Sequence, residues 1–460
     1  MCYNILQLGN NMIVRKIEAR LEQFLKDDGK YALLIDGARQ VGKTFIVREF
    51  ARRNYERFVE INFIEDAEAK GIFENSSNVK EILLKLTAFA KGGLKRGKTL
   101  VFLDEIQKCP EAVTFIKFLV EEGSLRYILS GSLLGVELKN IRSVPVGYMD
   151  EAKMYPLDFG EFVRANGESE VLLETAKDAW EKRRPLDPFY HDRLMKLFAL
   201  YLVIGGMPAV VQAYLDTSDI SVAVRVQRQI VALYRRDISQ YDKSRALHIR
   251  AVFDRIPGEL NKKNKRFYAS SIGAGTRFEN ISDEFLWLTE AGVAIPSFCV
   301  AEPTVPLKLA RKPTLFKLFS NDVGLLASQY MNGIQLDILN GKKAINFGSI
   351  YENVVAQELV AHGIDPNYFN SKKQGELDFV IERNGEILPI EVKSGKDYER
   401  HAALSNAIGN AAYGIHDAVV FHGGNVKVEN GILYAPIYMV HFLVPPSLPE
   451  SMIYRIGDPL

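Results

Sequence analysis

The feature that most constrains the fold of this chain is the octapeptide GARQVGKT, Gly37 to Thr44. It follows a short apolar run, YALLID, and it precedes the helical pattern FIVREFARR. Glycines let a backbone wrap around a phosphate, and the N-terminus of the following helix favours anions. We therefore expect a buried strand, a phosphate-binding loop and a helix, in which Lys43 reaches the outer phosphates of ATP and the Thr44 hydroxyl binds Mg²⁺. A chance match in a glycine-rich loop is the alternative, and the flanking strand and helix disfavour it.

A second strand-like run, Thr99 to Leu103, ends in the acids Asp104 and Glu105. Asp104 is placed to bind Mg²⁺ through water, and Glu105 is placed to polarise the water that attacks the γ-phosphate. Glu105 and Lys43 are thus the candidate catalytic residues of this half. The segment LRYILSGS offers Ser130 or Ser132 for contact with the γ-phosphate, although ordinary turn chemistry explains both serines equally well. The predicted nucleotide-binding set is Gly37, Ala38, Arg39, Gln40, Val41, Gly42, Lys43, Thr44, Asp104 and Ser130.

Three further strand-like runs complete a predicted parallel sheet. They cover residues 58–63, 125–132 and 151–157, and helical patterns separate the first two. Strands that alternate with helices favour a doubly wound α/β domain.

Length and charge limit the remaining possibilities. At roughly 150 residues per domain, 460 residues suggest about three domains. A net charge of +1 provides no global field for nucleic acid or membranes, so such binding would need a local patch. Three widely spaced cysteines and no signal-peptide pattern favour a cytoplasmic protein. The longest uncharged stretch, residues 197–214, is broken by Gly205, Gly206 and Pro208, which indicates a buried helix rather than a membrane span.

The middle of the chain is mostly helical in pattern. Residues 249–330 show helices followed by two strand-like runs, an order typical of a winged-helix module. Its helix near 279–290 is acidic. This favours docking of a protein, or weak contact with a nucleic-acid backbone, over recognition of a DNA sequence. The basic segment Asn261 to Arg266 and the arginines of residues 222–241 could meet phosphates, with a solvated surface as the alternative.

The carboxy-terminal part contains a predicted hairpin. Asn384-Gly385 lies between GELDFVIER and EILPIEVKSG, which indicates a two-residue type I′ turn. That turn places Asp378 opposite Glu391 and Glu376 opposite Lys393 on one face of the hairpin. The predicted apolar face consists of Leu377, Phe379, Ile381, Leu388, Ile390 and Val392.

Opposed carboxylates repel unless a cation or a shared proton lies between them. Asp378 and Glu391, with Glu352 from the preceding predicted helix at 345–363, form a candidate site for a second divalent metal, Mg²⁺ or Mn²⁺. Lys393 would orient a metal-activated water for phosphodiester cleavage of DNA or RNA, so Asp378, Glu391 and Lys393 are the candidate catalytic residues here. The alternatives are a simple Glu376–Lys393 ion pair and a folded scaffold without cleavage. The seven histidines show no metal-ligand spacing, and we expect them to be structural.

Six motifs in order carry a family resemblance. They are GARQVGKT, FLDEIQ, LSGS, YPLDFGEF, GGMP and YRRDISQY. Together they resemble the AAA-type bacterial and archaeal ATPases that carry a C-terminal domain of unknown function, and the resemblance covers nearly the whole chain. It implies that Lys43, Thr44, Asp104 and Glu105 are the ATPase residues. Relatives often have Gly-Arg before the YPL strand, where this chain has Gly147-Tyr148, and Arg142 is the nearest substitute for an arginine finger.

The resemblance also implies that the C-terminal part is similar to restriction-endonuclease-like nucleases. The predicted fold class is therefore α/β: a P-loop NTPase parallel sheet with a helical lid, a winged-helix-like module and a C-terminal restriction-endonuclease-like α/β domain. The expected boundaries are 1–160, 161–248, 249–330 and 331–460. The expected function is ATP binding and hydrolysis, with a C-terminal domain that binds or cleaves nucleic acid in a metal-dependent way. The alternative is an ATP-dependent switch that binds a protein partner, or another copy of itself, through an inactive nuclease-like scaffold.

Overall fold

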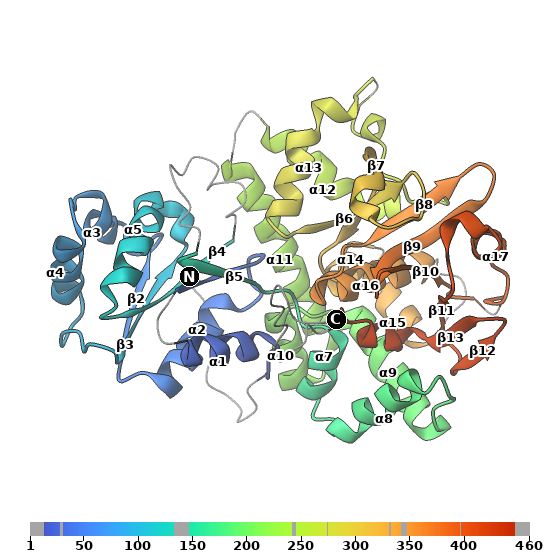
Figure 1. Cartoon of the computed structure of the whole chain (residues 1–460), viewed down its shortest axis with the longest axis horizontal. Helices are drawn as coiled ribbons and strands as arrows, with labels where there is room; N and C mark the ends of the chain where they lie inside the picture. The colour runs from blue at the N-terminus through green and yellow to red at the C-terminus, as the bar shows by residue number, and fades with distance from the viewer. Residues whose placement is uncertain are drawn as a thin grey trace, which may run out of the picture.

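The computed structural model describes residues 13–27, 31–132, 147–241, 245–273, 275–330, 333–341, 347–395 and 397–446. The chain forms two sheets, with helices between and around them (Figure 1). Arg142, the predicted substitute for an arginine finger, lies outside the described residues.

The amino-terminal sheet has five parallel strands in the order β2-β3-β4-β1-β5. The strands are β1 (Ala32–Asp36), β2 (Arg57–Asn62), β3 (Thr99–Asp104), β4 (Arg126–Gly131) and β5 (Met149–Lys153). The predicted parallel α/β arrangement is confirmed. The fifth strand, however, begins at Met149 instead of Glu151, because it pairs with β1 from Ala32 opposite Met149 onward.

Helices cover both faces of this sheet. They are α1 (Ile17–Lys26), α2 (Lys43–Asn54), α3 (Gly71–Glu74), α4 (Val79–Phe89) and α5 (Pro110–Glu122), with short 3₁₀ turns η1 (Ala67–Lys70) and η2 (Ile106–Lys108). Leu33 and Ile35 of β1 pack with α1 and α2, whereas Ala32 and Leu34 pack with α4 and α5. The alternating apolar residues of β1 thus bury the strand from both sides.

A helical layer follows, as the sequence predicts for this region. It contains α7 (Phe159–Ala165), α8 (Glu170–Glu181), α9 (Pro188–Ile204), α10 (Pro208–Thr217), α11 (Ile220–Tyr241), α12 (Ala246–Leu260), η4 (Ala269–Ser271), η5 (Phe278–Asn280) and α13 (Ser282–Glu290). The predicted buried helix is confirmed, since α9 ends at Gly205, whose φ is 74°. Among the described helices none alone has the length and apolarity of a membrane span; α9 and α10 pass that test only as a pair bent by 118°.

The carboxy-terminal sheet has eight strands in the order β12-β13-β11-β10-β9-β8-β6-β7. The strands are β6 (Ala294–Val300), β7 (Arg311–Ser320), β8 (Asn367–Ser371), β9 (Gly375–Arg383), β10 (Glu386–Val392), β11 (Ala418–His422), β12 (Lys427–Glu429) and β13 (Ile432–Pro436). Its helices and turns are η6 (Leu307–Ala310), α14 (Val323–Ser328), α15 (Ile334–Leu339), α16 (Phe347–Ala361), α17 (Ala402–Ile408), η7 (Ala411–Tyr413) and η8 (Ile437–Phe442).

The two strands that the sequence assigns to a winged-helix module, β6 and β7, belong to this same sheet. Phe298 to Val300 of β6 pair in parallel with Asn367 to Phe369 of β8. The expected boundary at 330/331 therefore runs through a continuous sheet. Alternation within single strands is readable in a sequence, but the partner across a parallel pair is fixed by tertiary packing.

The predicted hairpin is confirmed in its register. Glu386 pairs with Arg383 and Ile390 with Phe379, and the turn residues Asn384 and Gly385 have φ of 54° and 78°, as a type I′ turn requires. The predicted apolar face is only partly correct. Phe379 packs with the large core beneath α16, whereas Leu377 packs on the opposite face, because the β8–β9 register shifts between Asn367 and Phe369.

Candidate functional site

The octapeptide forms a loop between β1 and α2, at the carboxyl end of the strand. A side chain at Gly37 would place its Cβ 2.2 Å from the Met154 carbonyl oxygen, and φ is 154° there. Gly42, with φ of 98°, precedes the first turn of α2. The first backbone N–H groups of α2 have no partner within the helix, so this loop presents donors and a helix N-terminus to an anion. The sequence prediction of a phosphate cradle fits this geometry.

Lys43 is buried within its own loop. Its Nζ donates hydrogen bonds to the carbonyl oxygens of Gly37 at 2.7 Å and Ala38 at 2.9 Å. Burial lowers the pKa of the Lys43 ammonium, while Glu105, Asp36 and Asp104 oppose this shift. A polyphosphate offers the buried ammonium the charged partner that two neutral carbonyl oxygens do not.

Thr44, Asp104 and Ser130 meet at the edge of the sheet. The Thr44 hydroxyl donates to Asp104 Oδ2 at 2.8 Å, and the Ser130 hydroxyl donates to Asp104 Oδ1. Asp104 is buried at the end of β3. A threonine hydroxyl beside a strand-end carboxylate is an oxygen donor set that fits Mg²⁺. Ser130 thus contacts the carboxylate of the predicted metal site, and its contact with the γ-phosphate stays a prediction.

Glu105 occupies a strained backbone position directly after β3. Its φ of 54° and ψ of 47° place a residue other than glycine in the left-handed region. Gln107 Nε2 and the Ser132 hydroxyl both donate to Glu105 Oε2, the latter at 3.4 Å. These contacts hold the carboxylate at the carboxyl end of the sheet, on the same edge as the phosphate loop. Gln107 ends the motif FLDEIQ, but no role of its own could be assigned to it from the sequence.

Arg15 is a second residue that the sequence did not reveal. Its buried guanidinium donates to the Val41 carbonyl oxygen at 3.0 Å, to the Tyr155 carbonyl oxygen at 2.6 Å and to Glu161 Oε1 at 3.1 Å. It therefore ties the phosphate loop to the segment after β5. In the sequence, Arg15 is only a basic residue before an amphipathic helix. No local signal could therefore have identified its contacts with the phosphate loop.

The phosphate loop also contacts the helical layer. Arg39 pairs with Asp237 of α11, and the Arg39 carbonyl oxygen accepts a hydrogen bond from Tyr234 at 3.1 Å. The turn between α13 and β6 approaches the loop so closely that a Cβ at Gly292 would lie 3.3 Å from the Ala38 nitrogen. Part of the motif YRRDISQY and the α13–β6 turn therefore lie directly against the phosphate loop.

The carboxy-terminal candidate residues lie on and beside α16 and contact lysines, of which Lys317 is completely buried. Glu352 contacts two of them: Lys265 pairs with Oε1, and Lys317 Nζ lies 3.3 Å from Oε2. Lys317 also lies 2.8 Å from Glu376 Oε1 and is completely buried. Burial alone would raise the pKa of Glu352, but the two lysines hold this pKa below its usual value. The predicted Glu376–Lys393 pairing is replaced by Glu376–Lys317.

Asp378 and Glu391 lie near each other, as predicted, with different partners. Asp378 Oδ2 accepts a hydrogen bond from the Val392 N–H at 2.9 Å, and Glu391 Oε2 lies 2.9 Å from Lys393 Nζ. Burial, followed by the neighbouring Glu352 and Glu391, raises the pKa of Asp378 well above its usual value. Two groups of three possible metal ligands within 4.8 Å occur among the described residues, and Glu352 with Asp378 and Glu391 is not one of them.

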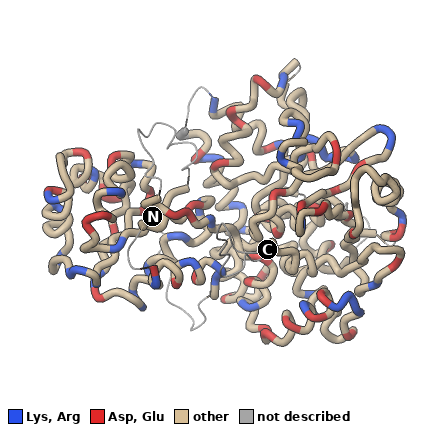
Figure 2. The backbone as a smooth tube through the Cα atoms, in the orientation of Figure 1, with Lys and Arg blue, Asp and Glu red and all other residues tan. Residues whose placement is uncertain are grey.

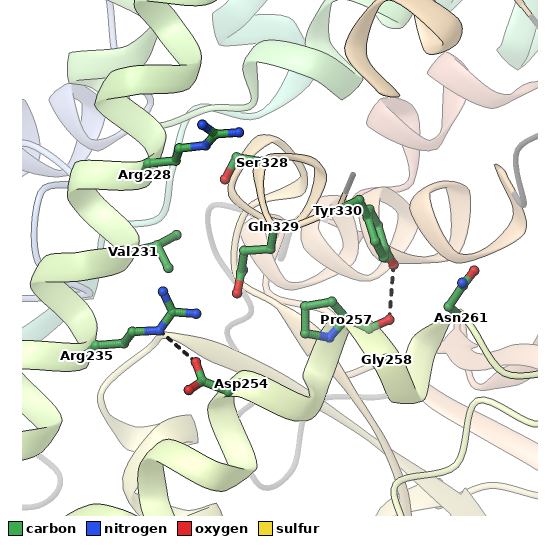
Figure 3. Close-up of a pocket in the computed structure, with 10 residues that line it drawn as sticks. All are labelled: Arg228, Val231, Arg235, Asp254, Pro257, Gly258, Asn261, Ser328, Gln329 and Tyr330. Carbon is green, nitrogen blue, oxygen red and sulfur yellow. Dashed lines mark hydrogen bonds and ion pairs between the residues drawn. The ribbon is translucent and has the colours of Figure 1, made fainter. Parts of the chain in front are cut away.

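Charged residues of both signs are interspersed over both halves of the chain, in keeping with the net charge of +1 (Figure 2). A hollow of about 740 Å³ lies between α11, α12 and the end of α14 (Figure 3). Arg228 and Arg235 line it, and Arg235 is paired with Asp254 at 2.7 Å. Two of the arginines that the sequence places on a solvated helix face thus border a cavity.

Comparisons with known proteins agree with this geometry in the amino-terminal part. Residues 29–163 match a family model described as an AAA domain. This match covers the five-stranded sheet and its phosphate loop, and we call this part of the chain the AAA domain. Residues 195–336 and 347–440 match two models, each described as a domain of unknown function (DUF8612 and DUF4143). Two regions thus follow the AAA domain, and the descriptions of their family models name no activity. A comparison with curated protein sequences gives no match.

Solved structures similar to the chain are distant. The Walker-type ATPase PABY2304 of Pyrococcus abyssi has 16% identity and a TM-score of 0.43, over 70% of this chain and 96% of that one. The ORC1 protein of Aeropyrum pernix, solved with DNA, has 14% identity and a TM-score of 0.29, over 69% and 92%. The ORC2 protein of Aeropyrum pernix, in ADPNP and ADP complexes, has 14% identity and a TM-score of 0.29, over 75% and 97%.

Proposed function

We propose that the AAA domain binds Mg·ATP in the loop Gly37 to Thr44 and hydrolyses it with Glu105 as the general base. The observation that carries this proposal is the joining of Thr44 to Asp104 at 2.8 Å, beside the strained Glu105. Mg²⁺, when bound, would neutralise charge on the β- and γ-phosphates. The Thr44 hydroxyl and the Asp104 carboxylate are the residues that would hold it.

The protein residues have separate tasks in this reaction. Lys43 exchanges its two carbonyl partners for phosphate oxygens, which gives the buried ammonium a charged partner. Glu105 orients and deprotonates the attacking water, while Gln107 and Ser132 fix one of its carboxylate oxygens. Arg15 keeps the loop in place from behind through the Val41 carbonyl oxygen.

Two substitutions separate binding from chemistry. Lys43→Ala should abolish binding of ATP in calorimetry, because the loop loses its phosphate-facing cation. Glu105→Gln should keep binding and lower turnover by about 100-fold or more, since an amide cannot accept the proton. The matched control is Glu111→Gln, an exposed residue in the first turn of α5, which should turn over normally. Unchanged turnover in Glu105→Gln would show that another group is the base.

A second candidate function concerns the carboxy-terminal sheet: an ATP-dependent switch whose nuclease-like part is a platform for a protein partner. Three lysines, Lys265, Lys317 and Lys393, already neutralise the carboxylates Glu352, Glu376 and Glu391. These ion pairs offset three of the four carboxylates, and Asp378, the fourth, has a raised pKa, which favours a scaffold over metal-dependent cleavage. Arg39, paired with Asp237, and the close approach of Gly292 to Ala38 supply a route from the nucleotide to the helical layer.

Cleavage assays distinguish this scaffold from the metal-dependent nuclease. Single-stranded DNA, duplex DNA and RNA would each be incubated with the wild type and with Mg²⁺ or Mn²⁺, with and without ATP. The scaffold proposal expects no cleavage above that of Asp378→Ala and Glu391→Ala prepared in parallel. Metal-dependent cleavage by the wild type that both substitutions remove would overturn it and establish the nuclease.

A further inference from the structure

Four ionisable side chains meet at a buried junction between the AAA domain and the carboxy-terminal sheet. Asp158 caps the N-terminus of α7, Glu358 lies near the end of α16, His362 directly follows that helix, and His441 belongs to η8. Each of the four side chains is at least nine-tenths buried. Neither proposed activity uses this junction, although Glu358 lies on the same helix as Glu352.

The four side chains surround a common point at distances that are too long for hydrogen bonds. His362 Nε2 lies 3.5 Å from Asp158 Oδ2 and 3.9 Å from Glu358 Oε2. His441 Nδ1 lies 3.8 Å from Asp158 Oδ1 and 3.5 Å from Glu358 Oε2. Ligands of a tetrahedral Zn²⁺, each about 2.0–2.1 Å from the metal, are separated by about 3.3 Å. The separations between Asp158 and the two imidazoles are slightly longer than this value, and Glu358 Oε2 lies 3.9 Å and 3.5 Å from the same imidazoles.

The atoms that face this point lack hydrogen-bond partners. Glu358 Oε2, His362 Nε2, His441 Nδ1 and Asp158 Oδ2 are all buried without one. Asp158 Oδ2 does form an ion pair with Lys16, whose side chain is 44% exposed. Unsatisfied buried polar atoms are rare in proteins, so the three that remain, on Glu358, His362 and His441, need a common explanation.

Hydrogen bonds with groups outside the cluster hold three of these side chains. His362 Nδ1 lies 2.8 Å from the Leu443 carbonyl oxygen, so Nδ1 carries the proton and donates it, which leaves the Nε2 lone pair directed inward. Glu358 Oε1 accepts from the Phe159 N–H at 2.8 Å and from the Tyr201 hydroxyl at 3.1 Å. Asp158 Oδ1 accepts from the Glu161 N–H at 2.8 Å. Outer hydrogen bonds of this kind orient ligands around protein-bound metals.

We propose that Asp158, His362 and His441, with Glu358 as the fourth ligand, bind a structural Zn²⁺ that joins the AAA domain to the carboxy-terminal sheet. Two imidazole nitrogens and two carboxylate oxygens form a donor set that Zn²⁺ accepts in four-coordinate sites. Atoms of Asp158, His362 and His441 already lie within 4.8 Å of one another. Lys16 competes with the metal for one Asp158 oxygen, and its half-exposed chain can turn outward.

Metal content tests this proposal directly. The full chain, expressed with added zinc and then desalted, should carry one zinc per chain by elemental analysis. His362→Gln and His441→Gln should each lower that content at least about five-fold, because a glutamine amide is a poor zinc ligand. The matched control is His401→Gln, whose imidazole contacts the Tyr434 hydroxyl at 2.7 Å elsewhere in the sheet. It should retain the metal.

Two further measurements do not depend on the folding of the histidine variants. Titration of the metal-stripped wild type with Co²⁺ should give the strong visible absorption of four-coordinate cobalt, and Zn²⁺ should abolish it. Zn²⁺ should also raise the melting temperature of the stripped wild type by several degrees, as expected for a ligand that binds only the folded chain. Zinc below a tenth of an equivalent, with no cobalt spectrum and no change in melting temperature, would overturn the proposal and leave the cluster as a buried ion-pair network.

Discussion

At the residue scale, buried charges determine how single substitutions affect this molecule. Lys317 is completely buried, lies between Glu352 and Glu376, and packs 5.0 Å from the ring centre of Tyr368. These carboxylates raise the pKa of Lys317 above its usual value although burial alone would lower it. The lysine therefore stays charged in the core, and its removal would leave carboxylates there without a partner.

We predict that Lys317→Met destabilises the chain by about 3–5 kcal/mol, the usual effect of removing one partner of a buried ion pair. The matched control is Lys427→Met, which breaks exposed pairs with Glu399 and Glu429 and should leave the urea midpoint unchanged. Equilibrium urea unfolding measures both. Equal midpoints for the two variants would mean that the buried carboxylates are not ionised.

Asp322 provides a pH-dependent prediction. It accepts hydrogen bonds from the Gly206 N–H at 2.6 Å and the Leu325 N–H at 2.8 Å, and burial raises its pKa to about 6. The folded chain thus retains the Asp322 proton to higher pH than the unfolded chain does. The stabilisation from this group is complete below about pH 4 and is lost as the pH rises through 6, on the order of 3 kcal/mol in all.

The measurement is the difference in unfolding free energy between the wild type and Asp322→Asn from pH 4 to 7. As the pH rises, the wild type should lose stability relative to Asp322→Asn. Asp365→Asn, at an exposed carboxylate, serves as the control and should show no such trend. A difference that stays constant across this range would contradict the raised pKa.

At the element scale, close contacts between backbones decide how the helices dock. The motif GGMP separates α9 from α10, and its second glycine lies against the segment after β5. Leu157 N–H donates to the Gly206 carbonyl oxygen at 2.7 Å. A Cβ at Gly206 would lie 2.0 Å from the Leu157 carbonyl oxygen, so no larger residue fits without separating the backbones.

We predict that Gly206→Ala destabilises the chain by about 3 kcal/mol or more, because the clash is with backbone rather than with a flexible side chain. Gly258→Ala is the matched control, since Gly258 lies inside α12 and nothing approaches its Cβ position within 4 Å. Alanine there should stabilise the chain by about 0.5–1 kcal/mol. The measurement is the melting temperature of each variant. A shift of both melting temperatures in the same direction would refute the prediction.

At the scale of the whole molecule, one apolar core connects the two sheets. The same buried cluster includes Leu33 and Phe102 of the AAA domain and Val354 and Phe421 of the carboxy-terminal part. The two tryptophans of the chain lie at different places along it. Trp180 stacks on Phe421 with ring centres 6.1 Å apart, whereas Trp287 lines the crevice beside Arg39.

We predict that the chain unfolds as one cooperative unit. Trp180→Phe and Trp287→Phe each leave a single fluorescent reporter, and the two variants should give one urea midpoint after correction for the stability change of each substitution. Mg·ATP should raise both midpoints equally, because the ligand stabilises the entire unit. Far-UV circular dichroism provides the control for each variant. Two separate transitions would show that the sheets unfold independently.

The sequence by itself determined the features that depend on neighbours along the chain. The phosphate loop, the acids after β3 and the register of the hairpin each follow from a strand, a turn and a helix in short succession. Their physical causes, positive φ at glycine, unpaired N–H groups at a helix start and side-chain alternation, all act within a few residues. The phosphate loop and the strand-end acids could therefore be located from the sequence, whereas their contacts with Arg15 and Gln107 could not.

Only the tertiary structure decided which distant groups meet. It placed β6 and β7 at the edge of the carboxy-terminal sheet, and Lys265 and Lys317 on Glu352, where the sequence favoured a metal. It also brought His362 and His441 to Asp158, although their spacing gave no sign of a ligand set. Such contacts form when apolar faces pack and carry polar groups with them, and packing between remote segments leaves no period in the sequence.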